Sequence, residues 1–313
     1  MTVLSTLGPL LLALLMGYWI NVSLLTPSRV STLLSQLTYV ILALIGFSLG
    51  ALDDFSEKLL TAGRQAVLFL IMICLVSLTA LFFSGRYLSS KEDKSITQSP
   101  LSTTDTSTVL SWAILHEAGK TLAWVVAGGI LGYVFSSFST HIDSLVMLLL
   151  YVLLFLIGCQ LRQGNYRLRK LFLNSQGLII ASVTIFSTLM AGVITAFIIG
   201  LPWQHGLAVV SGFGWYSLSG ILITGLGNPV LGTTAFLLDL SREILALMLI
   251  PIFAKINTHL SIGFSGATAM DFTLPMLSKF HSSNVIPICI ASGFIMSLLT
   301  PILIPLFLEM SFK

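Results

Sequence analysis

Charged residues are scarce in this chain. Only 9% of its 313 residues are Asp, Glu, Lys or Arg, whereas 56% are hydrophobic. Soluble globular proteins carry about 25% charged residues, so this chain cannot cover itself with a polar surface and its solvent must be lipid. A basic stripe with interleaved aromatic residues is also missing, and this absence excludes nucleic acid as a partner.

Motifs for nucleotide, metal or covalent chemistry are missing as well. The lack of a Walker A sequence argues against an ATP-driven pump, and no His or Glu residues have metal-ligand spacing. An intramembrane enzyme would need a nucleophile paired with a base, but the five histidines all lie near the ends of apolar runs. The three cysteines lie far apart within apolar runs, where packing is their expected role. We therefore predict neither an enzyme nor a bound cofactor or metal.

Apolar runs of about 20 residues, long enough to span a bilayer, recur through the whole chain. A spanning segment must satisfy its own backbone hydrogen bonds, so these runs predict helices. They lie near 3–25, 31–52, 64–83, 111–137, 143–162, 176–201, 231–254 and 284–310. Two further runs, 203–226 and 256–276, are rich in Gly, Ser and Thr and are either re-entrant, broken segments or full spans. We predict one all-α polytopic membrane domain over 1–313, with eight transmembrane helices plus two re-entrant segments, or ten spans.

One long polar stretch interrupts the apolar runs. It reads "SGRYLSSKEDKSITQSPLSTTDTSTV" from Ser84 to Val109, is rich in Ser and Thr and has few bulky apolar residues. Such a composition cannot bury enough apolar surface to fold on its own. We predict a flexible cytoplasmic loop over 84–110.

Lys and Arg residues near span ends predict the orientation of the chain. The strongest basic cluster, which should be cytoplasmic, consists of Arg162, Arg167, Arg169 and Lys170. Counting spans from this cluster places both termini outside, together with the acidic turn that begins at Asp53. The first run, "MTVLSTLGPLLLALLMGYWI", lacks a positive amino-terminal region and is interpreted as a membrane helix rather than a cleaved signal.

An internal repeat is visible in two of the spans. The segment "YVILALIGFSL" at Tyr39–Leu49 matches "YVLLFLIGCQL" at Tyr151–Leu161, and seven residues coincide in register. Coincidence between apolar helices is the alternative explanation. By the span count, however, the two copies run in opposite directions, and inverted repeats are typical of secondary transporters.

Charges inside spans are costly and therefore indicate where chemistry takes place. Asp239, Arg242 and Glu243 in "LLDLSREILALML" are three and four residues apart, so they share one face of a helix. One interpretation is an internal Asp–Arg pair that helps helices to pack. The other is that one pair is neutralised while the spare carboxylate faces a polar cavity.

A second acidic position is Asp271 in "SIGFSGATAMDFTLP", where no Lys or Arg is nearer than Lys279. An unpaired carboxylate among small polar residues suits a cation or proton site, and the alternative is a loop aspartate that caps a short helix. The neighbouring candidates for binding are Ser265, Thr268 and Thr273. At the end of the second span, Asp54 is interpreted as part of a solvated turn, whereas Asp53 is expected inside the outer mouth.

The stretch "SGFGWYSLSG" from Ser211 to Gly220 breaks an otherwise apolar run with three glycines and three serines. Irregular backbone at membrane depth is tolerated only where protein or a water-filled cavity covers it. The segment therefore predicts a broken helix or re-entrant loop that lines the transport path, although small-residue helix packing with an interfacial aromatic pair is the alternative. The candidate binding residues here are Gly214, Trp215, Tyr216, Ser217 and Ser219, and the two aromatic rings suit cation–π contact with an ammonium group.

The segments "SGFGWYSLSGILIT", "AFLLDLSREILALMLIP" and "SGATAMDFTLP" resemble the bacterial lysine exporter family, LysO-type. The similarity runs from "GFSLGALD" to the final span. The resemblance implies export of L-lysine and its toxic analogue thialysine across the bacterial inner membrane. It also implies that acidic residues in or near the membrane act in transport, which points to Asp53 and Asp271 here. Asp at position 54 and the long loop after the third span depart from the family pattern.

From these observations we expect a multi-pass secondary active exporter of L-lysine in the bacterial inner membrane, coupled to proton antiport. In this hypothesis Asp53 and Asp271 take the substrate ammonium and a proton in alternation. The alternative is a cation/proton antiporter that is not specific for amino acids, with Na⁺ or H⁺ bound at Asp271. The sequence leaves the coupling ion, selectivity against arginine or ornithine and a homodimeric state undecided.

Overall fold

The computed structural model describes residues 3–20, 26–87, 106–135, 139–163, 174–281 and 285–310. Helices and turns account for these residues, and none of them lies in a strand. Four helices are long and apolar enough to cross a membrane, namely α2, α3, α8 and α14, and several shorter helices are also strongly apolar. The chain is therefore an all-helical, polytopic membrane protein, as the sequence predicted.

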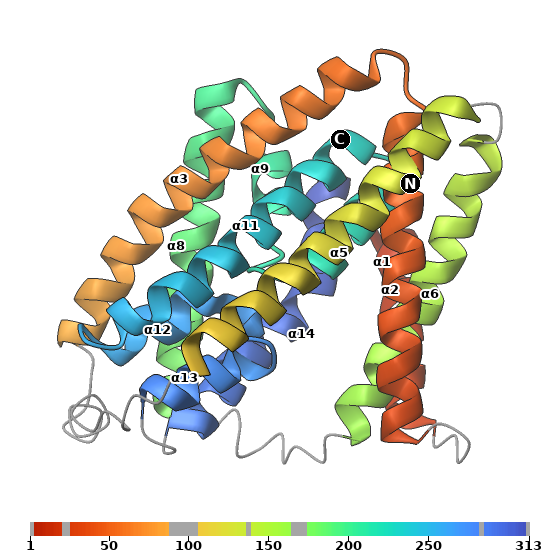
Figure 1. Cartoon of the computed structure of the whole chain (residues 1–313). Helices are drawn as coiled ribbons and strands as arrows, with labels where there is room; N and C mark the ends of the chain where they lie inside the picture. The colour runs from red at the N-terminus through yellow and green to blue at the C-terminus, as the bar shows by residue number, and fades with distance from the viewer. Residues whose placement is uncertain are drawn as a thin grey trace.

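The helices follow one another in the order shown by the colours of Figure 1. They are α1 (Val3–Trp19), α2 (Pro27–Gly50), α3 (Phe55–Tyr87), α5 (Thr106–Val134), α6 (Ser139–Gln163), α8 (Ser175–Ile199), α9 (Trp203–Val210), α10 (Tyr216–Gly225), α11 (Pro229–Phe253), α12 (Thr258–Ser265), the 3-10 helix η2 (Gly266–Met270), α13 (Leu274–Phe280) and α14 (Ile286–Met310). Each predicted apolar run thus contains helix.

The expected loop at 84–110 differs from the structure at both ends. Helix α3 continues to Tyr87, and α5 already begins at Thr106. The reason at the first end is tertiary: Ser84 is buried and its hydroxyl lies 2.7 Å from Nδ1 of His259 on α12. The middle of the expected loop, 88–105, lies outside the described residues, as do Arg167, Arg169 and Lys170 of the basic cluster.

The helices form two groups. In the first, α1 packs on α6, α2 packs on α5, and α2 also contacts α6. In the second, α3, α8 and α11 surround the short helices, and α14 packs against η2, α8 and α9. Contacts between the groups are fewer and run mainly from α14 and α10 to α1, α2 and α6. Figure 1 shows α1, α2 and α6 on one side of the molecule and α3 and α8 on the other.

Glycines bring the helices of the first group into backbone contact. A Cβ atom on Gly46 of α2 would collide with the carbonyl of Val125 on α5, and one on Gly158 of α6 would collide with the carbonyl of Leu14 on α1. Gly46 and Gly158 are the matching glycines of the two repeat copies. Such close approach through small residues is typical of helix association in lipid. The two repeat copies therefore hold two helix pairs, α2–α5 and α6–α1, in the same way.

Apolar and polar side chains are distributed as expected for a chain in lipid. Large apolar residues are exposed on the outer helices, among them Phe186 and Phe197 on α8 and Trp19 at the end of α1. In contrast, charged side chains are buried on α11, where Asp239, Arg242 and Glu243 are each at most 4% exposed. Helix α11 therefore carries the polar centre of the molecule.

Candidate functional site

Two interrupted helices cross at the centre of the second group. Helices α9 and α10 are separated by an irregular stretch at 211–215, and α12 is followed by η2 and a turn at Asp271. The backbone turns sharply at both breaks, with positive φ at Phe213 (52°), Gly214 (95°) and Gly266 (67°). The amide of Ala267 donates a 3.0 Å hydrogen bond to the carbonyl of Phe213, so the two breaks touch. The glycine-rich stretches predicted as broken helices are therefore broken, and they meet.

Asp239 of α11 binds the first break. Its Oδ1 accepts a 2.8 Å hydrogen bond from the amide of Gly214, and its Oδ2 accepts a 2.6 Å hydrogen bond from the hydroxyl of Ser219. Gly214 and Ser219 flank the N-terminus of α10, where the unsatisfied amides of a helix carry partial positive charge. The carboxylate therefore stabilises the start of this half-helix.

Arg242 of α11 binds the second break, three residues further along the same face. Its Nε donates to the carbonyl of Phe264 at 3.2 Å, and one terminal nitrogen donates to the carbonyl of Gly263 at 3.3 Å. These carbonyls lie at the C-terminus of α12, where a helix carries partial negative charge. The guanidinium also lies 5.8 Å from the centre of the Phe264 ring.

Asp239 and Arg242 thus reach to different breaks instead of forming the direct ion pair that one interpretation of the sequence expected. Each charge binds the end of a half-helix, the two charges also attract each other at longer range, and α11 ties both half-helices to one rigid element. The prediction that Asp239 and Arg242 share one face of a helix was correct. Their partners, however, depend on which segments cross beside α11.

Glu243, the next acidic residue on α11, has no comparable partner. It is 4% exposed, and its Oε2 makes no hydrogen bond. The carboxylates of Asp271 and Asp239 lie within electrostatic range of it. Burying a carboxyl group without a hydrogen-bond partner lowers the stability of the fold. Binding of a proton or a cation at this position would therefore be favourable.

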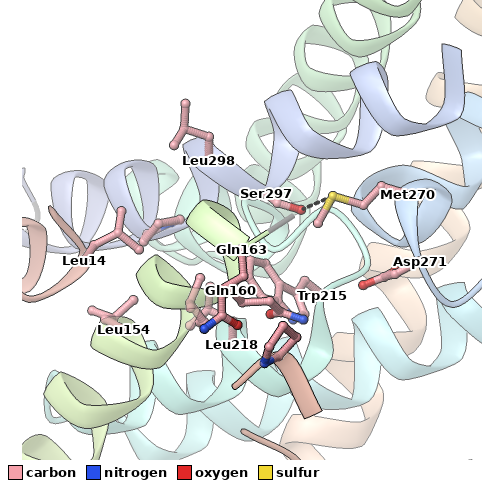
Figure 2. Close-up of a pocket in the computed structure, with 13 residues that line it drawn as sticks. Leu14, Leu154, Gln160, Gln163, Trp215, Leu218, Met270, Asp271, Ser297 and Leu298 are labelled. Atoms are coloured by element: carbon pink, nitrogen blue, oxygen red, sulfur yellow. Dashed lines mark hydrogen bonds between the residues drawn. The ribbon is translucent and has the colours of Figure 1, made fainter. Parts of the chain in front are cut away.

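A cavity of about 290 Å³ separates the two helix groups beside the crossing. Figure 2 shows Asp271 entering it from the η2 side and Gln160 and Gln163 entering it from α6, with Trp215 nearby. Its wall consists of Leu14, Pro27, Leu154, Ile157, Gln160, Gln163, Trp215, Leu218, Met270, Asp271, Ser297, Leu298 and Pro301. Asp271 is accessible to solvent there, and its Oδ1 accepts a 2.6 Å bond from the amide of Phe272. The cavity therefore combines apolar walls with one carboxylate and a few polar groups.

Asp53 lies elsewhere. It is exposed in the turn between α2 and α3, in a groove of about 650 Å³ that Tyr133 of α5 also lines. Its neighbour Asp54 is exposed too and has a positive φ of 58°. The structure thus places Asp53 and Asp271 on different cavities and does not bring together the two carboxylates that the resemblance singled out.

The hydroxyl groups singled out in the sequence mostly bond within their own segments. Ser265 donates to the carbonyl of Ser261, Thr268 to that of Ser265, and Thr273 to that of Thr268, at 2.8 to 3.0 Å. Their hydroxyls stabilise the turns after α12 in this conformation.

The aromatic pair and its neighbours at the first break divide between cavity and packing. Tyr216 packs edge-on against Phe236, with ring centres 5.8 Å apart, whereas Trp215 lines the cavity. Gly214 is buried and Ser217 is half-buried. Of the residues predicted to bind, Trp215 and Asp271 therefore share the cavity.

Sequence reasoning missed the two glutamines of α6. Gln160 occupies the position in the second repeat copy that Ser48 occupies in the first. Because it lies at the end of a span close to Arg162, its sequence context is typical of a residue at the membrane interface. Only the packing of α6 against the crossing places it on the cavity. Among the described residues, no group of three or more His, Cys, Asp or Glu side chains is arranged to hold a metal ion.

Comparison with known proteins decides the family. A family model described as "Lysine exporter LysO" matches residues 122–308, more than half of the chain. A protein of Escherichia coli (strain K12) named "Lysine exporter LysO" is 38% identical over 299 residues, which cover 95% of this chain and 97% of that protein. This chain belongs to the lysine exporter LysO family. A second relative, the "Putative lysine exporter" of Haemophilus influenzae, is 40% identical over 186 residues, 59% of this chain and 95% of that protein. No solved structure matches the chain.

Proposed function

We propose that this chain is a secondary active exporter that carries L-lysine, and its analogue thialysine, across the bacterial inner membrane in exchange for protons. The observation that carries the proposal is the similarity to the E. coli protein named "Lysine exporter LysO", which extends over nearly the full length of both chains. A transporter rather than an enzyme also agrees with the family.

The proposed topology has eight transmembrane helices and two re-entrant segments, α9–α10 and α12–η2–α13, with both termini outside. Figure 1, which marks both chain ends in its upper half, supports an even number of crossings. The matching glycine contacts of α2 and α6 support two repeats of inverted orientation.

We assign the substrate ammonium group to the cavity beside the crossing. Asp271 is the carboxylate that lines this cavity, and Trp215 adds an aromatic ring that suits cation–π contact. Glu243 is buried and lies within electrostatic range of Asp271. A cation and a proton cannot both neutralise one carboxylate, so binding of one releases the other, and exchange follows. In this proposal Asp53 attracts cations to the outer groove rather than sharing the deep site.

Transport also needs access to the cavity from both sides of the membrane. The cavity lies between the two helix groups, and the contacts between the groups are fewer than those within them. Rocking of one bundle against another around a central site is the usual route to alternating access. We therefore propose that the group α1, α2, α5 and α6 moves as a unit against the group that contains the crossing.

The decisive experiment is efflux of labelled L-lysine from loaded proteoliposomes, with and without an imposed pH gradient. We expect gradient-dependent efflux in the wild type and its loss in Asp271→Asn, because an amide cannot exchange a proton for an ammonium group. Asp54→Asn is the matched control: the same chemical change at an exposed turn where Asn also accepts a positive φ, with efflux retained. No lysine movement under any gradient would overturn the substrate and leave the Na⁺ or H⁺ antiporter as the better proposal.

A further inference from the structure

The cavity has polar groups on two sides within a largely apolar lining. Asp271 provides a carboxylate on the η2 side, and Gln160 and Gln163 provide amides on the α6 side. Leu154 and Leu218 contribute to the apolar wall. Small-molecule sites commonly have this composition, with a largely apolar lining and a few polar groups that fix orientation.

We infer that Gln160 and Gln163 recognise the α-amino acid end of the substrate and thereby separate lysine from diamines that carry the same ammonium group. This inference rests on the proposed export of lysine and assigns the specificity of that same site. An amide offers two N–H donors to a carboxylate and a carbonyl acceptor to an ammonium group. It can therefore bind the zwitterionic α-carbon end without adding a charge of its own.

The charges of site and substrate agree with this assignment. Lysine carries two ammonium groups and one carboxylate at neutral pH, so its net charge of about +1 matches one cavity carboxylate, Asp271. Arg162, the basic residue nearest to the glutamines in sequence, donates to the carbonyl of Trp19 at 2.8 Å and does not line the cavity. The side-chain amides of Gln160 and Gln163 are thus the polar groups on the α6 side that can donate hydrogen bonds to the substrate carboxylate.

The test compares L-lysine with cadaverine, the diamine that has the same chain and lacks the carboxylate. In proteoliposomes loaded with unlabelled lysine, counterflow uptake of labelled external lysine is measured with unlabelled L-lysine or cadaverine as the external competitor. For Gln160→Leu we expect about ten- to a hundredfold weaker competition by lysine, because hydrogen bonds to a charged group are lost, and unchanged competition by cadaverine. Gln160→Glu should go further and favour cadaverine over lysine, because a second carboxylate repels the α-carboxylate and attracts the second ammonium group.

Two controls separate this role from a structural one. Gln36→Leu makes the same change on an exposed position of α2 outside the cavity and should leave both compounds unaffected. Retained cadaverine competition in Gln160→Leu shows that the variant is folded, and Gln163→Leu repeats the test at the second amide. The inference would be overturned if lysine and cadaverine lost competition equally, or if neither glutamine variant lost any. Lysine exchange by the wild type would still support the proposed function in that case. A wild type that exchanges no lysine would overturn both.

Discussion

Glu243 is a buried residue in the polar centre, and the Oε2 of its carboxyl group has no hydrogen-bond partner. Such a group lowers the stability of the fold by about 1–3 kcal/mol. We predict that Glu243→Met, an unbranched apolar replacement of similar length, raises the free energy of unfolding by about this amount and abolishes gradient-dependent lysine efflux. Thermal unfolding of the purified protein and the proteoliposome assay measure the two effects.

Glu57 provides the comparison at the same scale. It is an exposed carboxylate in the first turn of α3, where negative charge favours the helix. Glu57→Met should therefore give no gain in stability and leave efflux intact. If Glu243→Met is instead destabilised, the carboxyl group has a structural partner that the geometry does not reveal.

The identity of residues in the site was only partly predictable from the sequence. Asp271 and Trp215, which line the cavity, could be named as candidates because a carboxylate and an aromatic residue beside glycines are conspicuous in an apolar chain. Gln160 was missed, since an uncharged amide at a span end carries no signal in hydropathy. The separate partners of Asp239 and Arg242 were also out of reach, because periodicity indicates a shared helix face but not which segments cross it.

At the scale of elements, the crossing of the two broken helices depends on close backbone contact. A Cβ atom on Gly266 would collide with the carbonyl oxygen of Phe213, and the φ of 67° at Gly266 is unfavourable for any L side chain. We predict that Gly266→Ala separates the two breaks, lowers the unfolding temperature and abolishes lysine counterflow. Thermal unfolding in detergent and counterflow in proteoliposomes provide the measurements.

Gly63 is the matched glycine, since it lies within α3 with no atom near the place of a Cβ. Alanine there should stabilise by about 1 kcal/mol, as expected for a helix interior, and should retain counterflow. Full counterflow by Gly266→Ala would show that contact between the breaks is dispensable for transport.

Helix positions were the most predictable elements, because an apolar run of about 20 residues has few alternatives in lipid. The end of α3 was predicted too early, at residue 83, whereas the helix continues to Tyr87. Serine near a span end is typical of a loop, but this one is buried against His259, and Gly85 beside it packs on Asn257. Contacts with a segment some 170 residues away leave no local trace in the sequence.

At the scale of the whole molecule, the two helix groups should move against each other during transport. Leu154 on α6 and Leu298 on α14 line the cavity from opposite groups. In a background without the native cysteines, we predict that Leu154→Cys with Leu298→Cys, joined by a cleavable bismaleimide, arrests lysine counterflow. Cleavage of the linker should restore it, because only the relative motion of the groups is blocked.

Tyr39→Cys with Trp124→Cys tests the same chemistry within one group. These residues lie on α2 and α5, and their rings stack with centres 6.2 Å apart. A linker at this pair should leave counterflow unchanged, since α2 and α5 stay together. Arrest by the second pair as well would mean that the group α1, α2, α5 and α6 is not a rigid unit.

The glycine contacts of this group also have a consequence for how the chain is made. Helix α2 finds its backbone partner only when α5 has been synthesised, and α1 must wait for α6, which is more than a hundred residues downstream. Until then, Gly17 and Gly46 face lipid without the helix that covers them. Helices α1 and α2 therefore wait in the bilayer during translation, and their membrane insertion and their assembly are separate events in time.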